Sequence, residues 1–292
     1  MRHVSSDNGV FVRLSGLRKT FGSLVAVDSL SLEIRRGEVF GLLGPNGAGK
    51  TTTVNMCVGL LRPTAGSVEI VGHGDPAHNS TRAQIGIAPQ SLAIYDELTA
   101  EENVRFLGQM YGLRGARLRE RVRWSLDFVG LLDRARDRVK TYSGGMKRRL
   151  NLAVALVHDP VLLICDEPTV GVDPQSRNAI FENILALKAL GRTIIYTTHY
   201  IEEVEKIAER VGIIDQGRLL ALDTVDRLIA THGGTASTLI IETADGEIRR
   251  QSDNPLAELE KLAAQGDLRR FRVERPDLET VFLNLTGRKL RE

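Results

Sequence analysis

The segment 44–51 combines three glycines with a lysine and a threonine in an order suited to holding phosphate. It reads Gly44-Pro45-Asn46-Gly47-Ala48-Gly49-Lys50-Thr51 and matches the pattern GxxxxGK[ST]. Glycines let successive backbone N–H groups turn inward around an anion, and the start of a following helix adds the positive end of its dipole. Lys50 supplies a mobile charge for the β- and γ-phosphates of a nucleotide, and Thr51 supplies a hydroxyl for Mg²⁺. The alternative is a glycine-rich turn with an incidental lysine, but the apolar run before it and the helical pattern after it favour a phosphate loop.

A pair of adjacent acids, Asp166 and Glu167, directly follows the apolar run 161–165. The carboxyl end of a buried strand is where ligands collect in open α/β sheets. There Asp166 would hold Mg²⁺ through water, and Glu167 would orient and deprotonate the water that attacks the γ-phosphate. Taken alone, two acids after a strand are usually a solvated loop start or a helix cap. The phosphate loop makes the catalytic interpretation the favoured one.

Ser143-Gly144-Gly145 forms a second candidate anion site. A serine cap and glycine amides precede a helix expected over 147–157. By itself this pattern is typical of an ordinary capped helix.

These motifs need a scaffold, and the pattern along the chain indicates a mostly parallel α/β sheet. Short apolar runs alternate with helical patterns from residue 11 to about 224, and the runs 39–43, 161–165 and 193–197 are expected to be central strands covered on both faces. Between about 98 and 159 the pattern becomes helical. Thr99 and Glu102 there have capping-box spacing.

After Gly217 the pattern changes to that of a small α+β unit. We expect a strand over 238–243, a hairpin turn at 244–247, a helix over 256–263 and a strand over 268–274. The predicted domains are 10–225, with a helical subdomain at about 98–159, and a C-terminal accessory domain at 226–292.

Composition excludes several classes of protein. The 292 residues are 42% hydrophobic and 26% charged, and their net charge is +2, which gives no strong basic field for nucleic acid or lipid. No apolar run approaches the roughly 20 residues that span a bilayer, so we expect no membrane span. Residues 1–7 lack the apolar core of a signal peptide, so we do not expect this chain itself to be secreted. Cys57 and Cys165 lack zinc-ligand spacing and are expected to be buried thiols.

In order and spacing, these elements resemble the nucleotide-binding subunit of an ATP-binding cassette (ABC) transporter across about residues 11–220. The resemblance implies a P-loop NTPase cassette with an antiparallel β subdomain and a helical subdomain. It implies that Phe21 stacks on adenine, Gln90 reaches the metal and the attacking water, and His199 touches the γ-phosphate. Gly171-Val172-Asp173-Pro174 looks like the family loop that crosses the dimer interface.

The resemblance completes three sets of site residues. The catalytic set is Lys50, Gln90, Glu167 and His199. The ATP-binding set is Phe21, Gly44, Pro45, Asn46, Gly47, Ala48, Gly49, Lys50, Thr51, Thr52, Ser143, Gly144 and Gly145. The metal set, for Mg²⁺, is Thr51, Gln90 and Asp166.

The family also implies partners. Its signature, here Ser143-Gly144-Gly145, closes over ATP held by another subunit, which implies an ATP-dependent homodimer that moves a separately encoded membrane permease from the cytoplasmic face of the cell membrane. Phe21, Met146, Val170 and Val172 depart from the commonest family residues. None of these departures removes a catalytic group.

The tail 276–288 resembles that of the subfamily serving drug, polysaccharide and nodulation-factor exporters, including daunorubicin-resistance-type ATPases. The leading hypothesis is therefore an ATPase subunit of an exporter for a drug-like, lipid or saccharide substrate. The alternative is a soluble, non-transport cassette ATPase acting on nucleic acid or ribosomes, for which we would expect tandem cassettes, a coiled-coil insertion or a basic face. The sequence contains one phosphate loop and is nearly neutral.

Overall fold

The computed structural model describes residues 9–234, 237–243, 246–264 and 270–288. The chain divides into two compact units, which we call unit 1, Met1–Ala221, and unit 2, Leu222–Glu292. Three predicted features fall partly or wholly outside the described residues: the N-terminal segment 1–7, the hairpin turn at residues 244–245, and the first two residues of the strand expected over 268–274.

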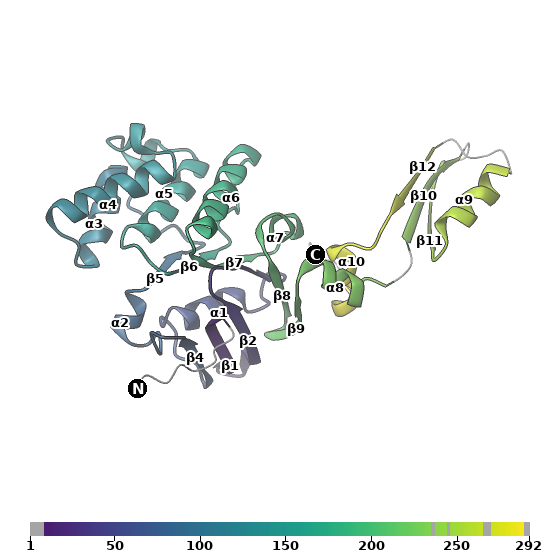
Figure 1. Ribbon diagram of the computed structural model, residues 1–292, viewed down its shortest axis with the longest axis horizontal. Helices are drawn as coiled ribbons and strands as arrows, with labels where there is room; N and C mark the ends of the chain where they lie inside the picture. Colours follow the sequence, from purple (N-terminus) through teal and green to yellow (C-terminus); the bar gives the residue numbers. More distant parts are fainter. Residues whose placement is uncertain (1–8, 235–236, 244–245, 265–269, 289–292) are drawn as a thin grey trace. The chain divides into compact units, whose positions relative to one another are not determined.

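Unit 1 is built around a six-stranded sheet with the order β5-β6-β7-β3-β8-β9. Figure 1 labels all of these strands except β3. Neighbouring strands from β5 to β8 are parallel. The strands are β3 (Val39–Leu43), β5 (Ile85–Ala88), β6 (Leu162–Asp166), β7 (Thr193–Thr198), β8 (Arg210–Asp215) and β9 (Arg218–Asp223). Every residue of β3, β6 and β7 is buried, which confirms the three apolar runs as central strands.

The strand order brings the site segments together. Strands β5, β6, β7 and β3 are consecutive neighbours, and their registers align Ala88 with Cys165, Asp166 with Thr197, and Leu43 with Thr198. Gln90 therefore follows β5, Glu167 follows β6, His199 follows β7 and the phosphate loop follows β3, all at one edge of the sheet. This is the edge at which open α/β sheets bind ligands.

A three-stranded antiparallel sheet, ordered β2-β1-β4, forms the expected second subdomain. Its strands are β1 (Val10–Phe21), β2 (Leu24–Arg35) and β4 (Ala65–Ile70). Phe21 and Leu24 pair at the tip of the β1–β2 hairpin, where Gly22 has a φ of 58°. The hairpin therefore presents the Phe21 ring at a turn, where it is half exposed.

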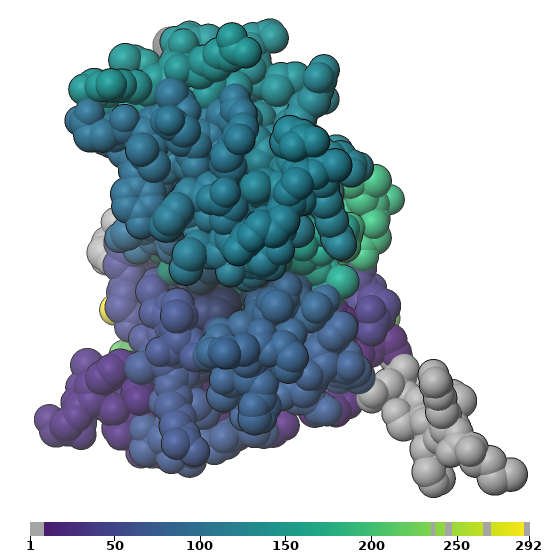
Figure 2. Space-filling view, turned by 90° about the vertical axis from the view of Figure 1, so that its left-hand side faces the viewer, coloured from purple at the N-terminus to yellow at the C-terminus, as the bar shows by residue number. Residues whose placement is uncertain are grey.

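The helical subdomain contains α3 (Ala100–Met110), α4 (Gly115–Phe128) and α5 (Gly144–Leu156). Thr99 and Glu102 form the predicted capping box, in which Thr99 N–H donates to Glu102 at 2.8 Å and Glu102 N–H donates to Thr99 Oγ1 at 3.2 Å. Buried side chains of these helices share one core with β6 and β7. Figure 2 shows the helices as a teal lobe above the purple and blue N-terminal elements.

The remaining helices of unit 1 are α1 (Lys50–Cys57), α2 (Asn79–Arg82), α6 (Pro174–Ala189) and α7 (Ile201–Ile207), with two 3₁₀ turns at Leu132–Arg134 and Val139–Thr141.

We expect His158, just after α5, to make the stability of unit 1 depend on pH. Its ring stacks on Tyr111 at 3.6 Å, and its Nε2 lies 3.1 Å from the Ile85 carbonyl oxygen. Burial lowers the pKa of His158 from 6.5 to about 4. Because the unfolded chain takes up a proton near pH 6.5 and the folded chain only near pH 4, the free energy of unfolding falls as pH is lowered through this window, by up to about 3 kcal/mol. We expect His158→Gln to reduce this fall, measured by urea unfolding at pH 7, 5.5 and 4. An unchanged pH dependence of the unfolding free energy in this variant would show that His158 is not its source.

Unit 2 contains α8 (Val225–His232), β10 (Ser237–Thr243), β11 (Gly246–Ser252), α9 (Pro255–Ala264), β12 (Arg270–Glu274) and α10 (Leu278–Thr286). The strands form an antiparallel sheet ordered β11-β10-β12. Helix α10 packs on α8 and buries Leu278, Val281 and Phe282, whereas Leu259 of α9 packs on Leu239 and Ile241. Among the described residues of the whole chain, no helix combines the length and apolar character required to cross a bilayer.

Candidate active site

The site segments line a cleft of about 850 Å³, large enough for a nucleotide. One side is the β1–β2 hairpin, including Phe21, and the floor is the phosphate loop and the first turn of α1. Gln90, Glu167 and His199 close the other side, and Gln216 lines it from the turn between β8 and β9. The structure therefore brings together Phe21, the phosphate loop and all four predicted catalytic residues, Lys50, Gln90, Glu167 and His199.

The conformation of the phosphate loop requires its glycines. Gly49 has a φ of 100°, and a Cβ there would lie 2.5 Å from the Ala26 carbonyl oxygen. A Cβ on Gly44 would lie 2.4 Å from the Ile214 carbonyl oxygen. Helix α1 begins at Lys50, so the N–H groups of its first turn have no partner within the helix and are available to an anion. The loop and helix fit a nucleotide phosphate.

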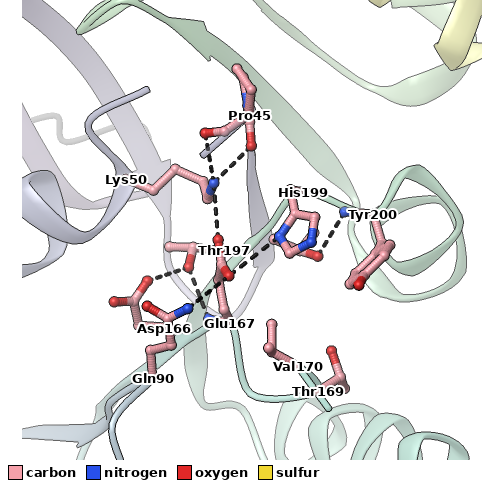
Figure 3. Close-up of polar contacts among 12 residues, drawn as sticks. Pro45, Lys50, Gln90, Asp166, Glu167, Thr169, Val170, Thr197, His199 and Tyr200 are labelled. Atoms are coloured by element: carbon pink, nitrogen blue, oxygen red, sulfur yellow. Dashed lines mark hydrogen bonds and ion pairs between the residues drawn. The ribbon is translucent and has the colours of Figure 1, made fainter. Parts of the chain in front are cut away.

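The Lys50 ammonium group is buried at the head of this loop. It donates to the carbonyl oxygens of Gly44 at 2.7 Å and Pro45 at 3.0 Å, and it lies 3.0 Å from Glu167 Oε1. Its three N–H donors are thus matched by three oxygens, two from the loop and one from the carboxylate (Figure 3). A nucleotide phosphate that bound the Lys50 ammonium group would replace these contacts.

Glu167 lies at the centre of the site, with its side chain almost completely buried. Besides the Lys50 contact, Glu167 Oε2 accepts a hydrogen bond from Gln90 Nε2 at 3.1 Å and lies 3.3 Å from His199 Nδ1 (Figure 3). The His199 contact lacks the alignment of a hydrogen bond. Glu167 has a φ of 46°, which is uncommon for a residue other than glycine. Its own N–H donates to the carbonyl and hydroxyl oxygens of Thr197, each at 3.1 Å, and these bonds hold this conformation.

Thr197 also positions Asp166. Its hydroxyl donates to Asp166 Oδ1 at 2.5 Å and accepts from the Glu167 N–H, so one side chain of β7 holds both acids of β6 (Figure 3). The candidate metal ligands are the Thr51 hydroxyl, the Gln90 amide and the Asp166 carboxylate. All three offer oxygen atoms, the ligands that Mg²⁺ prefers, so the donor set fits this ion.

Ser143, Gly144 and Gly145 do not line this cleft. Ser143 caps α5, because its Oγ accepts from Met146 N–H at 3.2 Å. A Cβ on Gly145 would lie 2.0 Å from Ser176 Oγ on α6, so this helix start packs too closely for any other residue. Within one chain, the second predicted anion site is separate from the first.

Two residues that the sequence motifs did not single out hold the site loops. The first is Arg148, which the sequence marks only as part of a short basic run. Its guanidinium donates to the carbonyl oxygens of Gln90 and Val170, the latter at 3.2 Å. Burial lowers the pKa of Arg148, while the charge of Glu167 opposes this change. Arg148 thereby connects the loop after β5 to the loop after β6.

The second is Glu203 on α7, whose carboxylate is buried among hydroxyl groups. It accepts from Thr169 Oγ1 at 2.6 Å, from Thr198 Oγ1 at 2.7 Å and from the Tyr196 hydroxyl at 3.0 Å. Thr169 lies two residues after Glu167 and Thr198 directly precedes His199. The carboxylate therefore links the backbone segments that carry the two catalytic candidates. Burial and the nearby Glu203 charge raise the pKa of Tyr196 well above its usual value, so Tyr196 stays a donor.

We expect Glu203 to act as a positioning residue. Glu203→Gln keeps the shape but removes the charge and turns one acceptor oxygen into a donor, so Thr169 or Thr198 loses its acceptor. We expect kcat for ATP to fall about tenfold with little change in KM, since the hydrogen bonds to this carboxylate come from Thr169, Tyr196 and Thr198. The phosphate loop meets this network through the backbone, where Gly44 N–H donates to the Thr198 carbonyl oxygen at 3.3 Å. Tyr196→Phe removes one donor and should have a smaller effect. A parallel change in KM and kcat, or an unchanged kcat, would contradict this role.

Comparisons with known proteins agree with this geometry. The family model described as "ABC transporter" matches residues 27–170. The linearmycin resistance ATP-binding protein LnrL of Bacillus subtilis (strain 168) is 41% identical over 312 residues, covering 96% of this chain and all of the relative. A Nod factor export ATP-binding protein I of Ralstonia nicotianae is 38% identical and covers 96% of this chain and 94% of the relative.

Solved structures give the same result. The structure of an ATP-binding subunit of an ABC transporter is 30% identical with a TM-score of 0.69, covering 76% of this chain and 93% of that one. A dimeric ATP-binding cassette in a post-hydrolysis state bound to ADP and Pi is 28% identical with a TM-score of 0.66, covering 73% of this chain and 98% of that one. Cassette fold, site and relatives together assign the chain to the ABC transporter family, as an ATP-binding subunit whose ATPase activity is coupled to transport.

Proposed function

We propose that this subunit hydrolyses Mg-ATP in the cleft at the edge of the parallel sheet. The observation that carries the proposal is the position of Glu167, whose carboxylate lies within 3.3 Å of Lys50, Gln90 and His199. The phosphate loop binds the β- and γ-phosphates through backbone N–H groups and Lys50, and Phe21 stacks on the base. Mg²⁺, held by Thr51, Asp166 and Gln90, would neutralise phosphate charge.

Glu167 is the general base in this proposal. A water oxygen attacks the γ-phosphorus, its proton passes to Glu167, and the bond from phosphorus to the bridging oxygen breaks to release ADP and phosphate. Glu167 Oε1 is paired with Lys50. When a phosphate of ATP binds the Lys50 ammonium group, the ion pair with Glu167 breaks and this oxygen becomes free to accept the proton. The same residue that binds ATP thereby releases the base.

The active unit in this proposal is a homodimer. Ser143, Gly144 and Gly145 lie outside the cleft of their own chain, which supports their contacting the ATP held by a second copy. Members of this family dimerise and work with membrane permeases. ATP binding at both cleft edges would close the dimer, and hydrolysis would open it.

An apolar groove on the helical subdomain is the proposed docking site for the permease. It has a volume of about 620 Å³ and is lined by residues 92–95 together with Phe106, Leu107, Met110 and Tyr111. Met110 is 71% exposed, and Tyr95, Phe106 and Tyr111 are also exposed, so the groove leaves a group of neighbouring apolar side chains uncovered, as protein-binding surfaces do. The groove begins two residues after Gln90, so a helix bound in it would touch the segment that carries a metal ligand.

We place this subunit on the cytoplasmic face of the membrane, energising an exporter. Support for export comes from the names of relatives, which are resistance and Nod factor export proteins. A drug-like, lipid or saccharide cargo would be contacted by the permease. Nothing in the described residues favours the alternative of nucleic-acid or ribosome remodelling.

Co-purification with the permease tests the docking groove. We expect Met110→Glu to reduce recovery of the complex from detergent-solubilised membranes at least fivefold, because it places a charge in the groove, while ATP hydrolysis by the isolated subunit stays unchanged. Leu190→Glu is the matched control, since Leu190 is also an exposed apolar residue of unit 1 but lies at the end of α6. Equal recovery of the two variants would contradict docking of the permease at this groove. The absence of any MgATP hydrolysis by the wild-type complex would contradict the proposed function.

A further inference from the structure

Among the described residues, strand β12 of unit 2 is an exposed edge of its sheet and carries apolar side chains. It lies at the end of the order β11-β10-β12, and all five of its residues are exposed. Phe271 is 51% exposed and Val273 is 38% exposed. An edge strand offers unpaired N–H and C=O groups to another strand, and natural proteins usually cover or charge such edges. This edge is therefore a candidate for pairing.

The register shows why these side chains remain exposed. Phe271 is opposite Ile241 and Val273 is opposite Leu239, so both lie on the face that α9 covers. Helix α9 packs on Leu239 and Ile241 of the central strand and leaves the β12 part of this face uncovered. The opposite face of β12 carries charge, from Arg270, Arg272 and Glu274.

The sequence of β12 is complementary to itself when it runs antiparallel to a second copy. With Arg272 on a two-fold axis, Phe271 lies opposite the partner's Val273 and Arg270 lies opposite the partner's Glu274. Apolar side chains thus meet on the α9 face and opposite charges meet on the other face. The central pair of like charges is offset, because Arg272 already lies 2.6 Å from Glu274 of its own strand.

We propose that β12 pairs with β12 of a second copy, which joins two three-stranded sheets into one of six strands. The partner is a second copy because the sequence of β12 is complementary to itself. The proposed function, on which this inference rests, also brings two copies together. Five residues per strand give a weak contact. Tethering in a cassette dimer strengthens such a contact where the linkers let the two strands meet. The accessory units then hold the two subunits together when hydrolysis opens the ATP-bound interface.

Cysteine cross-linking of the full chain tests this pairing with a matched control. Arg272 and Arg249 flank the same residue, Ile240, from the two edges of the sheet. In the proposed register, Arg272→Cys places two cysteines directly opposite each other, at the roughly 4.5–5.5 Å between Cα atoms that a disulfide spans. Arg249→Cys places an equivalent cysteine on β11, the opposite edge of the sheet, which does not pair in this proposal. The native Cys57 and Cys165 are buried, and burial raises the pKa of Cys57 to about 12, so neither should cross-link.

We expect at least tenfold more disulfide-linked dimer from Arg272→Cys than from Arg249→Cys during oxidation with MgATP. Adding Phe271→Glu to Arg272→Cys should reduce this dimer severalfold, whereas adding Leu256→Glu, a change of an exposed apolar residue on α9, should not. Equal cross-linking at both edges, or none at Arg272→Cys, overturns the pairing. ATP hydrolysis by the same samples reports the proposed function separately, so active protein without the cross-link overturns this inference alone.

Discussion

Replacing Glu167 by glutamine is expected to lower steady-state ATP hydrolysis at least 100-fold while ATP still binds. The amide has nearly the same shape as the carboxylate but takes no proton from water, and general-base catalysis contributes about 10²–10⁴ in rate. The phosphate loop, Lys50 and Phe21 are unchanged, so ATP affinity is retained. Because ATP would bind without turnover, a dimer should accumulate with ATP. Phosphate release and light scattering coupled to size-exclusion chromatography measure the two effects.

Glu182→Gln serves as the control for this experiment. Glu182 lies on α6 of the same unit and is exposed, so the same chemical change there should leave both the rate and the oligomeric state unaffected. Undiminished hydrolysis by Glu167→Gln would remove Glu167 from its proposed role. Loss of ATP binding in that variant would show instead that the carboxylate holds the phosphate loop in place through Lys50.

The second large effect is expected for Lys50→Ala, which should weaken ATP binding by about 10- to 100-fold. Charge-assisted hydrogen bonds contribute about 1.5–3 kcal/mol, and Lys50 is the cation at the head of the phosphate loop. The substitution has a second consequence. It removes the cation 3.0 Å from the buried Glu167 and should also reduce the stability of unit 1. Nucleotide titration and thermal unfolding are measured on the same protein.

A double variant separates the two consequences. Lys50→Ala with Glu167→Gln removes both charges of this ion pair, so its melting temperature should recover most of the loss seen for Lys50→Ala alone. Its ATP affinity should stay low, because the phosphates still lack the ammonium group. Recovery of both properties would mean that Lys50 serves only to neutralise Glu167. Recovery of neither would mean that the ion pair does not determine stability.

Local sequence patterns predicted the scaffold of this site well, for a physical reason. The strand β3 begins and ends where the apolar run predicts, β6 is shifted by one residue toward the C-terminus, and β7 extends one residue beyond its predicted end. Parallel strands covered on both faces must be apolar throughout, so their signal is continuous. The phosphate loop is likewise a local motif, since its glycines, lysine and first helical turn are adjacent in the chain.

The contacts that hold the catalytic loops were not predictable in the same way. Glu203 meets Thr169, 34 positions away, and Arg148 meets Gln90, 58 positions away. These contacts depend on which strands become neighbours and on how α5 and α7 lie against them. A glutamate in the acidic first turn of a helix after His199 is typical of a solvated helix start. Only the packing of α7 on β7 and β3 shows that Glu203 is buried.

The place of β9 has a consequence for dividing this protein into parts. The strand occupies one edge of the six-stranded sheet, yet the division between the two units falls inside it, after Ala221. A truncation at that boundary would remove Leu222 and Asp223 from the sheet, and an inserted residue would shift the strand's alternating side chains to opposite faces. Exchange of accessory units between relatives should therefore use a junction at Thr224, the cap of α8, which leaves the whole edge strand with its cassette.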